Sequence, residues 1–214
     1  MTAPRIFLLS PAHCGGKRAA ILLNERATFP LAQRFRSAGL TIGEAFTFLS
    51  GLYFRGKLTY AARFAHPPRG YAGVQVITTN RGLVTADLPV RPADLLAFGA
   101  VDIGVHDTEY RDALHRDLSR LQQIPKLEIV LLGSVATGKY VDVLLDVMGE
   151  RLLFPVEFVG RGDMSRGALL LRAAEEGREL AYAPVAGSVR RGHRPPRLAP
   201  RRSSDAAPPK SPSR

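Results

Sequence analysis

The sequence contains a single cysteine, Cys14, and few of the patterns that mark secreted or membrane proteins. One cysteine cannot form an internal disulfide, which excludes a small bridged scaffold and favours a reducing compartment. No apolar run approaches the ~20 residues needed to span a bilayer. The run at residues 6–9 is also far shorter than the core of a secretion signal. We therefore expect a soluble cytoplasmic protein without a membrane partner.

Metal-ligand patterns are also missing. The histidines show no paired spacing, and there is no second cysteine to complete a zinc site. They are His13, His66, His106, His115 and His193. We expect neither a metal site nor a cofactor.

The composition predicts one folded domain with an appendage. Hydrophobic residues make up 45% of the 214 residues and charged residues 23%, as in ordinary globular chains. Residues 186–214 hold eight basic residues, one acidic residue and six of the sixteen prolines. Such a segment buries too little apolar surface to offset chain entropy, so we expect a domain at 1–185 and a disordered basic tail at 186–214. The tail is either an arm for nucleic acid or another acidic surface, or a solubilising extension.

Apolar runs and helical patterns alternate along the domain. Buried strands are expected at 5–9, 74–79, 127–132, 152–159 and 179–185. Helices are expected from a capping box at 41–44 through 64, after Asp107 or Thr108, at 141–148 and at 163–175. This alternation indicates an α/β fold, a three-layer sandwich with a mainly parallel sheet of about five strands.

Ligands of such sheets bind at the carboxyl ends of the strands. This rule selects four loops, at 10–18, 78–84, 133–140 and 160–166, and each carries glycine beside a basic residue. If the topology is parallel, Ser10, Asn80, Ser134 and Asp163 should border one cleft.

The loop at 133–140 resembles a Walker A phosphate loop, because it follows a buried strand and opens a helix. Ser134, Thr137 and Lys139 are its candidate phosphate-binding residues. The last position should be Ser or Thr to reach magnesium, but it is Tyr140, and no later strand ends in a magnesium-binding Asp. A P-loop ATPase is therefore excluded. Two interpretations of this loop remain open. It is either an anion site at a helix start or a glycine-containing turn with an exposed lysine.

The loop at 10–18 contributes Ser10 and Lys17 as candidate ligand-binding residues. It also places Cys14 beside His13 and two cations, which lowers a thiol pKa. A phosphatase-like loop would need arginine six residues after the cysteine, where Ala20 stands, and no third group orients the histidine. A packed or merely exposed thiol is the favoured interpretation.

The loop at 78–84 offers Asn80 and Arg81 as ligand-binding residues, although its glycine equally suits a plain turn. In the loop at 160–166, Arg161 and Arg166 can grip a carboxylate or phosphate, and Asp163 is the candidate catalytic acid or base. Asp163 is also the favoured N-cap of the following helix.

The long helix interleaves aromatic and basic residues, a pattern that can serve nucleic acid by stacking and phosphate contact. The favoured alternative packs Tyr53 and Tyr60 in the core and leaves Arg55, Lys57 and Arg63 as a solvated basic face.

Three segments, at 5–10, 51–61 and 77–87, resemble an uncharacterised bacterial α/β family. That family is similar in outline to the uracil-DNA-glycosylase-like domain attached to archaeosine synthases. Its turn usually carries Lys-Tyr where this chain has Asn80-Arg81, and the catalytic Asp and His motifs of true uracil-DNA glycosylases are absent here. The resemblance implies a nucleobase or nucleic-acid context and transfers no catalytic residue.

Three functions remain open at this point. The first is a domain that binds or acts on a nucleotide, nucleobase or nucleic acid through the four loops. The second is a non-catalytic nucleic-acid-binding module that uses the basic tail. The third is a scaffold for a small molecule or a protein, with an incidental tail.

Overall fold

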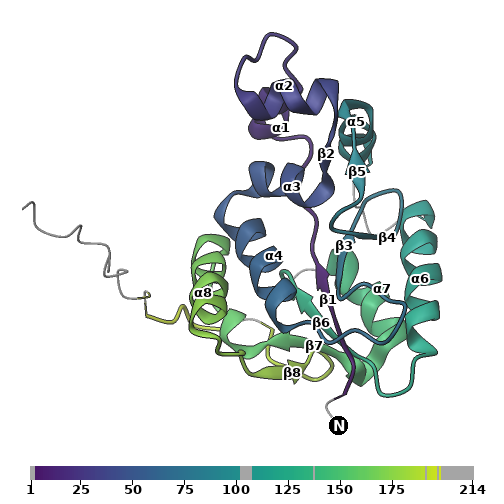
Figure 1. Ribbon diagram of the computed structural model, residues 1–214. Coiled ribbons are helices and arrows are strands. Elements are labelled where there is room, and N and C mark those ends of the chain that lie inside the picture. The colour runs from purple at the N-terminus through teal and green to yellow at the C-terminus, as the bar shows by residue number, and fades with distance from the viewer. Residues whose placement is uncertain (1–2, 102–107, 137, 191, 197, 199–214) are drawn as a thin grey trace, which may run out of the picture.

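The sheet has six strands in the order β4-β3-β1-β6-β7-β8. The computed structural model describes residues 3–101, 108–136, 138–190, 192–196 and 198, apart from the side chain of Lys139 (Figure 1). The strands are β1 (Arg5–Leu9), β3 (Val74–Ile77), β4 (Leu83–Thr85), β6 (Glu128–Leu132), β7 (Leu152–Pro155) and β8 (Tyr182–Pro184). The four central strands run parallel, and β4 and β8 are antiparallel edges. The α/β class and the mainly parallel sheet are confirmed, while β4 was missed.

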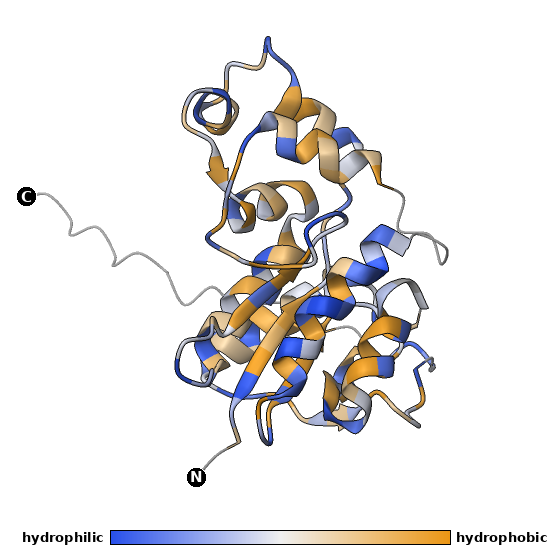
Figure 2. Ribbon diagram, turned by 90° about the vertical axis from the view of Figure 1, so that its right-hand side faces the viewer, coloured by the Kyte–Doolittle hydropathy of each residue, from blue (hydrophilic) through white to orange (hydrophobic). Residues whose placement is uncertain are grey.

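Helices cover both faces of this sheet, which gives the predicted three layers. The helices α4 (Leu52–Phe64) and α8 (Asp163–Glu176) lie on one face, and α6 (Thr108–Gln122) and α7 (Gly138–Met148) lie on the other (Figure 1). Alternate residues of β1 serve the two cores, Phe7 packing toward α4 and Ile6 toward α6 and α7. In Figure 2 the central strands are mostly orange and the covering helices alternate between orange and blue. The continuous apolar runs of the strands follow from this two-sided burial.

A helical cap lies beyond the carboxyl ends of the strands (Figure 1). It consists of α1 (Lys17–Leu23), α2 (Pro30–Ser37), α3 (Ile42–Ser50), α5 (Pro92–Ala100) and the antiparallel pair β2 (Leu40–Thr41) and β5 (Pro89–Val90). Two short 3-10 helices, η1 (Gly149–Arg151) and η2 (Val156–Phe158), lie before and after β7. Most of the cap had no counterpart in the sequence-based assignment.

The long helix expected up to residue 64 is two helices, so that prediction was wrong. Its start is correct, because the Thr41 hydroxyl accepts from the Glu44 amide at 3.2 Å and the Glu44 carboxylate accepts from the Thr41 amide at 2.9 Å. Gly51 then adopts φ 60° and ψ −128°, a conformation that disfavours any side chain. The chain turns at Gly51, which leaves α3 in the cap and lays α4 against the sheet.

The backbones of α4 and α8 are in close contact where they cross. A Cβ atom at Gly56 would lie 2.6 Å from the carbonyl oxygen of Gly167, and one at Gly167 would lie 2.7 Å from that of Leu52. The two glycines therefore permit an approach that larger residues exclude. This crossing brings Lys57 of α4 and Asp163 of α8 to the same edge of the sheet.

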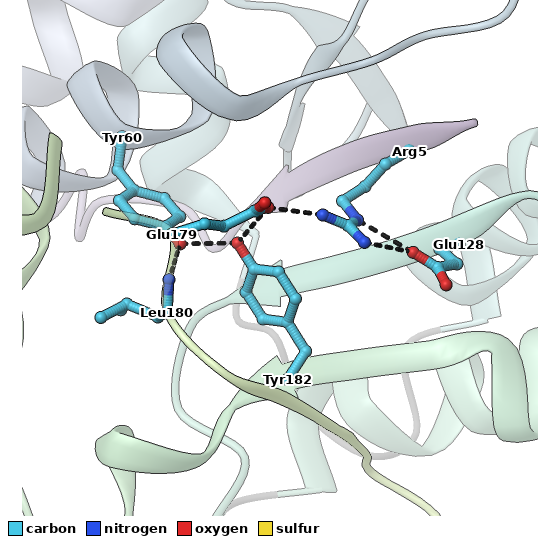
Figure 3. Close-up of polar contacts among 6 residues, drawn as sticks. All are labelled: Arg5, Tyr60, Glu128, Glu179, Leu180 and Tyr182. Atoms are coloured by element: carbon cyan, nitrogen blue, oxygen red, sulfur yellow. Dashed lines mark hydrogen bonds and ion pairs between the residues drawn. The ribbon is translucent and has the colours of Figure 1, made fainter. Parts of the chain in front are cut away.

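A polar network fastens the opposite, amino-terminal end of β1 (Figure 3). The Tyr60 hydroxyl lies 2.6 Å from the Tyr182 hydroxyl and accepts from the Leu180 amide at 2.7 Å. Tyr182 also donates to Glu179 at 2.9 Å, and Arg5 pairs with Glu179 and with Glu128. Burial is the main cause that raises the pKa of Tyr182. The network joins α4, β1, β6 and β8 far from the cap.

We expect Tyr182→Phe to lower the free energy of unfolding by about 1–2 kcal/mol, because it removes two hydrogen bonds of a part-buried hydroxyl. Urea unfolding monitored by circular dichroism measures the effect. Tyr71→Phe is the matched control, since Tyr71 is exposed. Equal urea midpoints for the two variants would contradict a stabilising role for the network.

The first part of the basic tail lies against the domain. The Arg161 guanidinium donates to the Pro196 carbonyl at 3.3 Å, and Leu198 packs on the core beside α8. Disorder was expected for all of 186–214, and residues 199–214 of this tail lie outside the described residues. Among the helices that the structure describes, none combines the length and apolar character needed to cross a membrane.

Candidate functional site

A cleft of about 700 Å³ lies between the carboxyl ends of the parallel strands and the helical cap. Its walls come from the segment after β1, from α4, from the end of α5 and from the first residue of α8. The lining residues used below are Ser10, His13, Ser50, Tyr53, Lys57, Thr79, Phe98, Ala100, Ser134, Tyr140 and Asp163. Three of the four residues expected to converge are present, and Asn80 is not. Its neighbour Thr79 takes its place.

Lys57 forms the floor of the cleft, and it is only 1% exposed. Its Nζ donates to the carbonyl oxygen of Ser10 at 2.6 Å and to the Ser10 hydroxyl at 3.0 Å. The same Nζ lies 4.6 Å from the ring centroid of Tyr53 and 4.7 Å from that of Phe54. The prediction that Lys57 belongs to a solvated basic face was therefore wrong, whereas Tyr53 and Tyr60 pack in the core as expected.

Burial lowers the pKa of Lys57 to about 7, because an ammonium group loses hydration in the interior, and the negative charge of Asp163 only partly opposes this. Within the described part of the chain, no carboxylate forms an ion pair with Lys57. A substantial fraction of this amine is neutral near pH 7, so it can accept a proton.

Tyr140 closes the loop that resembles a Walker A motif. Its hydroxyl accepts from the Ser134 amide at 2.9 Å and donates to the Ser134 carbonyl at 3.0 Å, and the tyrosine is buried. The amide that a phosphate loop would offer to a ligand is thus occupied by the tyrosine. Thr137 and the side chain of Lys139 lie outside the described residues. The position that departs from the Walker pattern has a structural role.

Asp163 is the first residue of α8 and borders the cleft with a side chain that is 68% exposed. The N-cap is Gly162, and its position carries no side-chain cap bond, so the assignment of Asp163 as N-cap was wrong. The carboxylate lies 3.6 Å from the Arg166 guanidinium. Asp163 is available to a ligand that enters the cleft from solvent.

The two arginines of this loop are bound to the protein backbone and do not line the cleft. Arg166 is buried and donates from Nε and Nη2 to the Phe158 carbonyl at 3.2 and 3.1 Å. Arg161 donates to the Glu157 carbonyl at 3.0 Å and to the Ser165 hydroxyl at 3.2 Å. Both therefore stabilise the entry to α8, and their proposed role as phosphate ligands is corrected.

The remaining predicted ligand residues also lie outside the cleft. Arg81 pairs with Asp94 and stacks 5.3 Å from the Phe98 ring centroid. Asn80 borders a smaller hollow beside α6, and Lys17 is exposed at the start of α1. Of the predicted ligand and catalytic residues, Ser10, Ser134 and Asp163 therefore line the cleft, whereas Lys17, Asn80 and Arg81 lie outside it.

Cys14 is buried and its thiol contacts the Ala12 carbonyl at 3.5 Å. Burial raises the pKa of the thiol to about 12, which keeps it protonated and poorly nucleophilic at neutral pH. The preference for a packed thiol agrees with this geometry.

Lys57 is the functional candidate that the sequence analysis missed, although a signal was present. It lies four residues after Tyr53 and three before Tyr60, which places it on the apolar stripe of α4. A lysine on the buried side of a helix is rare enough to mark a site.

No family model, no curated protein and no solved structure matches this chain. Function is therefore inferred from the chemistry of the cleft.

Proposed function

We propose that the protein binds a nucleotide or a nucleobase in the cleft at the carboxyl ends of its strands. The observation that carries the proposal is the mixed lining of this cleft, which combines aromatic rings with hydroxyl groups. A nucleobase has the matching character, because it has two apolar faces and a hydrogen-bonding edge. The resemblance to the uracil-DNA-glycosylase-like domain points to the same class of ligand.

The aromatic part of the lining comes from Tyr53, Phe98 and Tyr140, and the polar part includes Ser50, Thr79 and Ser134. The Thr79 hydroxyl donates to the Phe98 carbonyl at 2.9 Å and can still accept. A volume of about 700 Å³ falls within the range of small-molecule sites, roughly 300–1,000 Å³.

Charge supports an anionic ligand. Lys57 at the floor forms no ion pair with a carboxylate in the described part of the chain, and in its protonated form it favours an anionic group of the ligand. The carboxylate of Asp163 lies at the solvent side of the same cleft. The alternative function is nucleic-acid binding through the basic tail at 186–214, and four of the eight basic residues of this tail lie within 199–214, which the structure does not describe. The cleft is therefore the better-supported ligand site.

A bulky residue at the mouth of the cleft tests the proposal. Ala100 is exposed and lines the cleft, whereas Ala97 is exposed on the same helix without lining it. We expect a nucleotide or nucleobase at 100 times its Kd to stabilise the full-length protein by about 2.7 kcal/mol. Ala100→Trp should abolish this stabilisation, and Ala97→Trp should preserve it.

Thermal-shift measurements of the three proteins against nucleobases, nucleosides, nucleotides and short oligonucleotides provide the readout. No shift in wild type with any member of this set would contradict the proposed function. A shift that survives in Ala100→Trp would place the ligand elsewhere. An oligonucleotide shift that weakens steeply with salt and survives in Ala100→Trp would instead support binding by the tail.

A further inference from the structure

The side-chain hydroxyl of Ser10 lies within hydrogen-bond distance of the Lys57 amine in the cleft. Ser10 is the first residue after β1 and borders the cleft, and Lys57 lies behind it on α4. The Oγ to Nζ distance of 3.0 Å is within hydrogen-bond reach. A nucleophile in front of a buried base is the arrangement that nucleophilic catalysis requires.

The base is held in place from several sides. The Ser10 carbonyl accepts from Nζ at 2.6 Å, and the rings of Tyr53 and Phe54 lie against the amine. A base oriented by further groups in this way meets the geometric requirement for an activated hydroxyl. Ser50 and Ser134, the other serines of the cleft, form no hydrogen bond with a lysine amine in the described part of the structure.

We propose that Ser10 and Lys57 are a nucleophile and its general base for the hydrolysis of a carboxylic ester or amide bound in the cleft. This activity goes beyond the binding of a nucleotide or nucleobase and does not depend on that ligand class. An acylated or amide-bearing nucleotide derivative would satisfy both proposals.

The reaction balances with water as the only co-reactant. Ser10 Oγ attacks the carbonyl carbon while its proton passes to the neutral amine of Lys57. Collapse of the tetrahedral intermediate breaks the ester or amide bond, and the departing alcohol or amine takes the proton from Lys57. Water then attacks the acyl-serine and gives a proton to Lys57, the acid leaves, and that proton returns to Ser10.

The first turn of α8 adds a second feature to the same cleft. The backbone amides at the start of this helix have no acceptor within the helix. Asp163, its first residue, lines the cleft, so this end of α8 lies at the cleft. The partial positive charge of a helix start stabilises an oxyanion nearby. Asp163 itself borders the solvent side, where it can position the water of the second step.

A fluorophosphonate probe, which phosphonylates activated serines, tests the pair directly in the full-length protein. Mass spectrometry should find the adduct on Ser10 in wild type and none at this position in Ser10→Ala. Because general-base assistance contributes roughly 100-fold or more, Lys57→Met should slow labelling at least about 100-fold. Ser37→Ala and Lys126→Met change exposed residues outside the cleft and should label at the wild-type rate.

The pH dependence in wild type provides a readout that needs no variant to fold. The labelling rate should rise through about pH 7 as Lys57 loses its proton. Among the described residues, the ionisable groups near the amine include Asp163 and Arg166 of α8, Tyr53 of α4 and Tyr140 of α7, and burial raises the pKa of both tyrosines. His13 also borders the cleft and is therefore tested separately. If Lys57 sets the midpoint of the pH dependence, His13→Gln should leave that midpoint unchanged.

Three results would overturn the pair: no adduct on Ser10 in folded wild type, an unchanged rate in Lys57→Met, or a rate that is flat from pH 6 to 8.5. The two proposals fail separately. A nucleotide-dependent thermal shift without Ser10 labelling removes the nucleophile and leaves the binding site. Labelling without any such shift leaves the nucleophile and removes the nucleotide or nucleobase as ligand.

Discussion

Replacement of Lys57 by methionine should remove a large pH dependence from the stability of this protein. Between pH 7 and 10, the free energy of unfolding of wild type should rise relative to that of Lys57→Met. The slope should approach 1.4 kcal/mol per pH unit, so that the difference changes by roughly 2–3 kcal/mol between pH 7 and 9. Methionine keeps an unbranched apolar side chain, one atom shorter than that of lysine, without an ionisable group.

The sign follows from the direction of the pKa shift. The pKa of Lys57 is about 7 in the folded protein and 10.5 in an unfolded chain. Between these values the unfolded state binds more protons, so acidification favours unfolding and a rise in pH favours folding. Below pH 7 both states are protonated and the full cost of burying the charge is present. Above about 10.5 both states are neutral and that cost has disappeared.

Urea unfolding of both proteins at a series of pH values measures this difference directly. Cys14 and the buried tyrosines are shared by wild type and variant, so their titration cancels in the comparison. Lys126→Met serves as control, because Lys126 is exposed and should give a constant difference from wild type. A parallel pH dependence in wild type and Lys57→Met would mean that the buried amine keeps its ordinary pKa.

The sheet was predictable from sequence because its central strands are buried on both faces. Continuous apolar runs such as 6–9 and 129–132 are typical of strands that are covered by helices on both faces. The cap was not predictable in the same way. Its helices α1 and α2 are only 7 and 8 residues long, which is too short for a clear helical period. The break at Gly51 was hidden because a single glycine inside a periodic pattern is usually tolerated.

The position of the cleft followed from topology, whereas its chemistry did not. The rule that ligands bind at the carboxyl ends of parallel strands selected Ser10, Ser134 and Asp163 correctly as cleft residues. The same rule treated every cation in a loop as a ligand, although Arg161 and Arg166 bind backbone carbonyls. A sequence shows which residues are charged, but it does not show where their side chains point. Lys57 was missed as a functional residue for the same reason, because the neighbouring arginines on the helix suggested a solvent-exposed face.

Substitution of Gly56 by alanine should destabilise the protein by about 2 kcal/mol, even though alanine is the better helix former by roughly 1 kcal/mol. The new Cβ would lie 2.6 Å from the carbonyl oxygen of Gly167, and backbone atoms cannot rotate away as a side chain can. The helices α4 and α8 must therefore move apart. For a chain of this size, the loss corresponds to a fall in Tm of about 4–8 °C.

Gly162→Ala is the matched control, because a Cβ there meets no atom within 4 Å and the backbone is extended rather than left-handed. Differential scanning fluorimetry should show a smaller fall for this variant, at most about 2–4 °C, because Gly162 is the N-cap of α8 and alanine is a poorer N-cap than glycine. Equal stability of Gly56→Ala and Gly162→Ala would mean that the helix crossing relaxes at no cost.

The same substitution should also disturb the cleft, because Lys57 is the next residue along α4 and Asp163 lies on the helix that is displaced. A shift of a few tenths of an ångström is enough to lengthen the 3.0 Å contact between Lys57 and Ser10. Ser10 labelling should therefore be slower in Gly56→Ala at a temperature where the variant is fully folded, and unchanged in Gly162→Ala. A wild-type rate in Gly56→Ala would show that the pair is held by β1 and the aromatic rings alone. A slower rate would tie the tight crossing of two glycines to the geometry of the site.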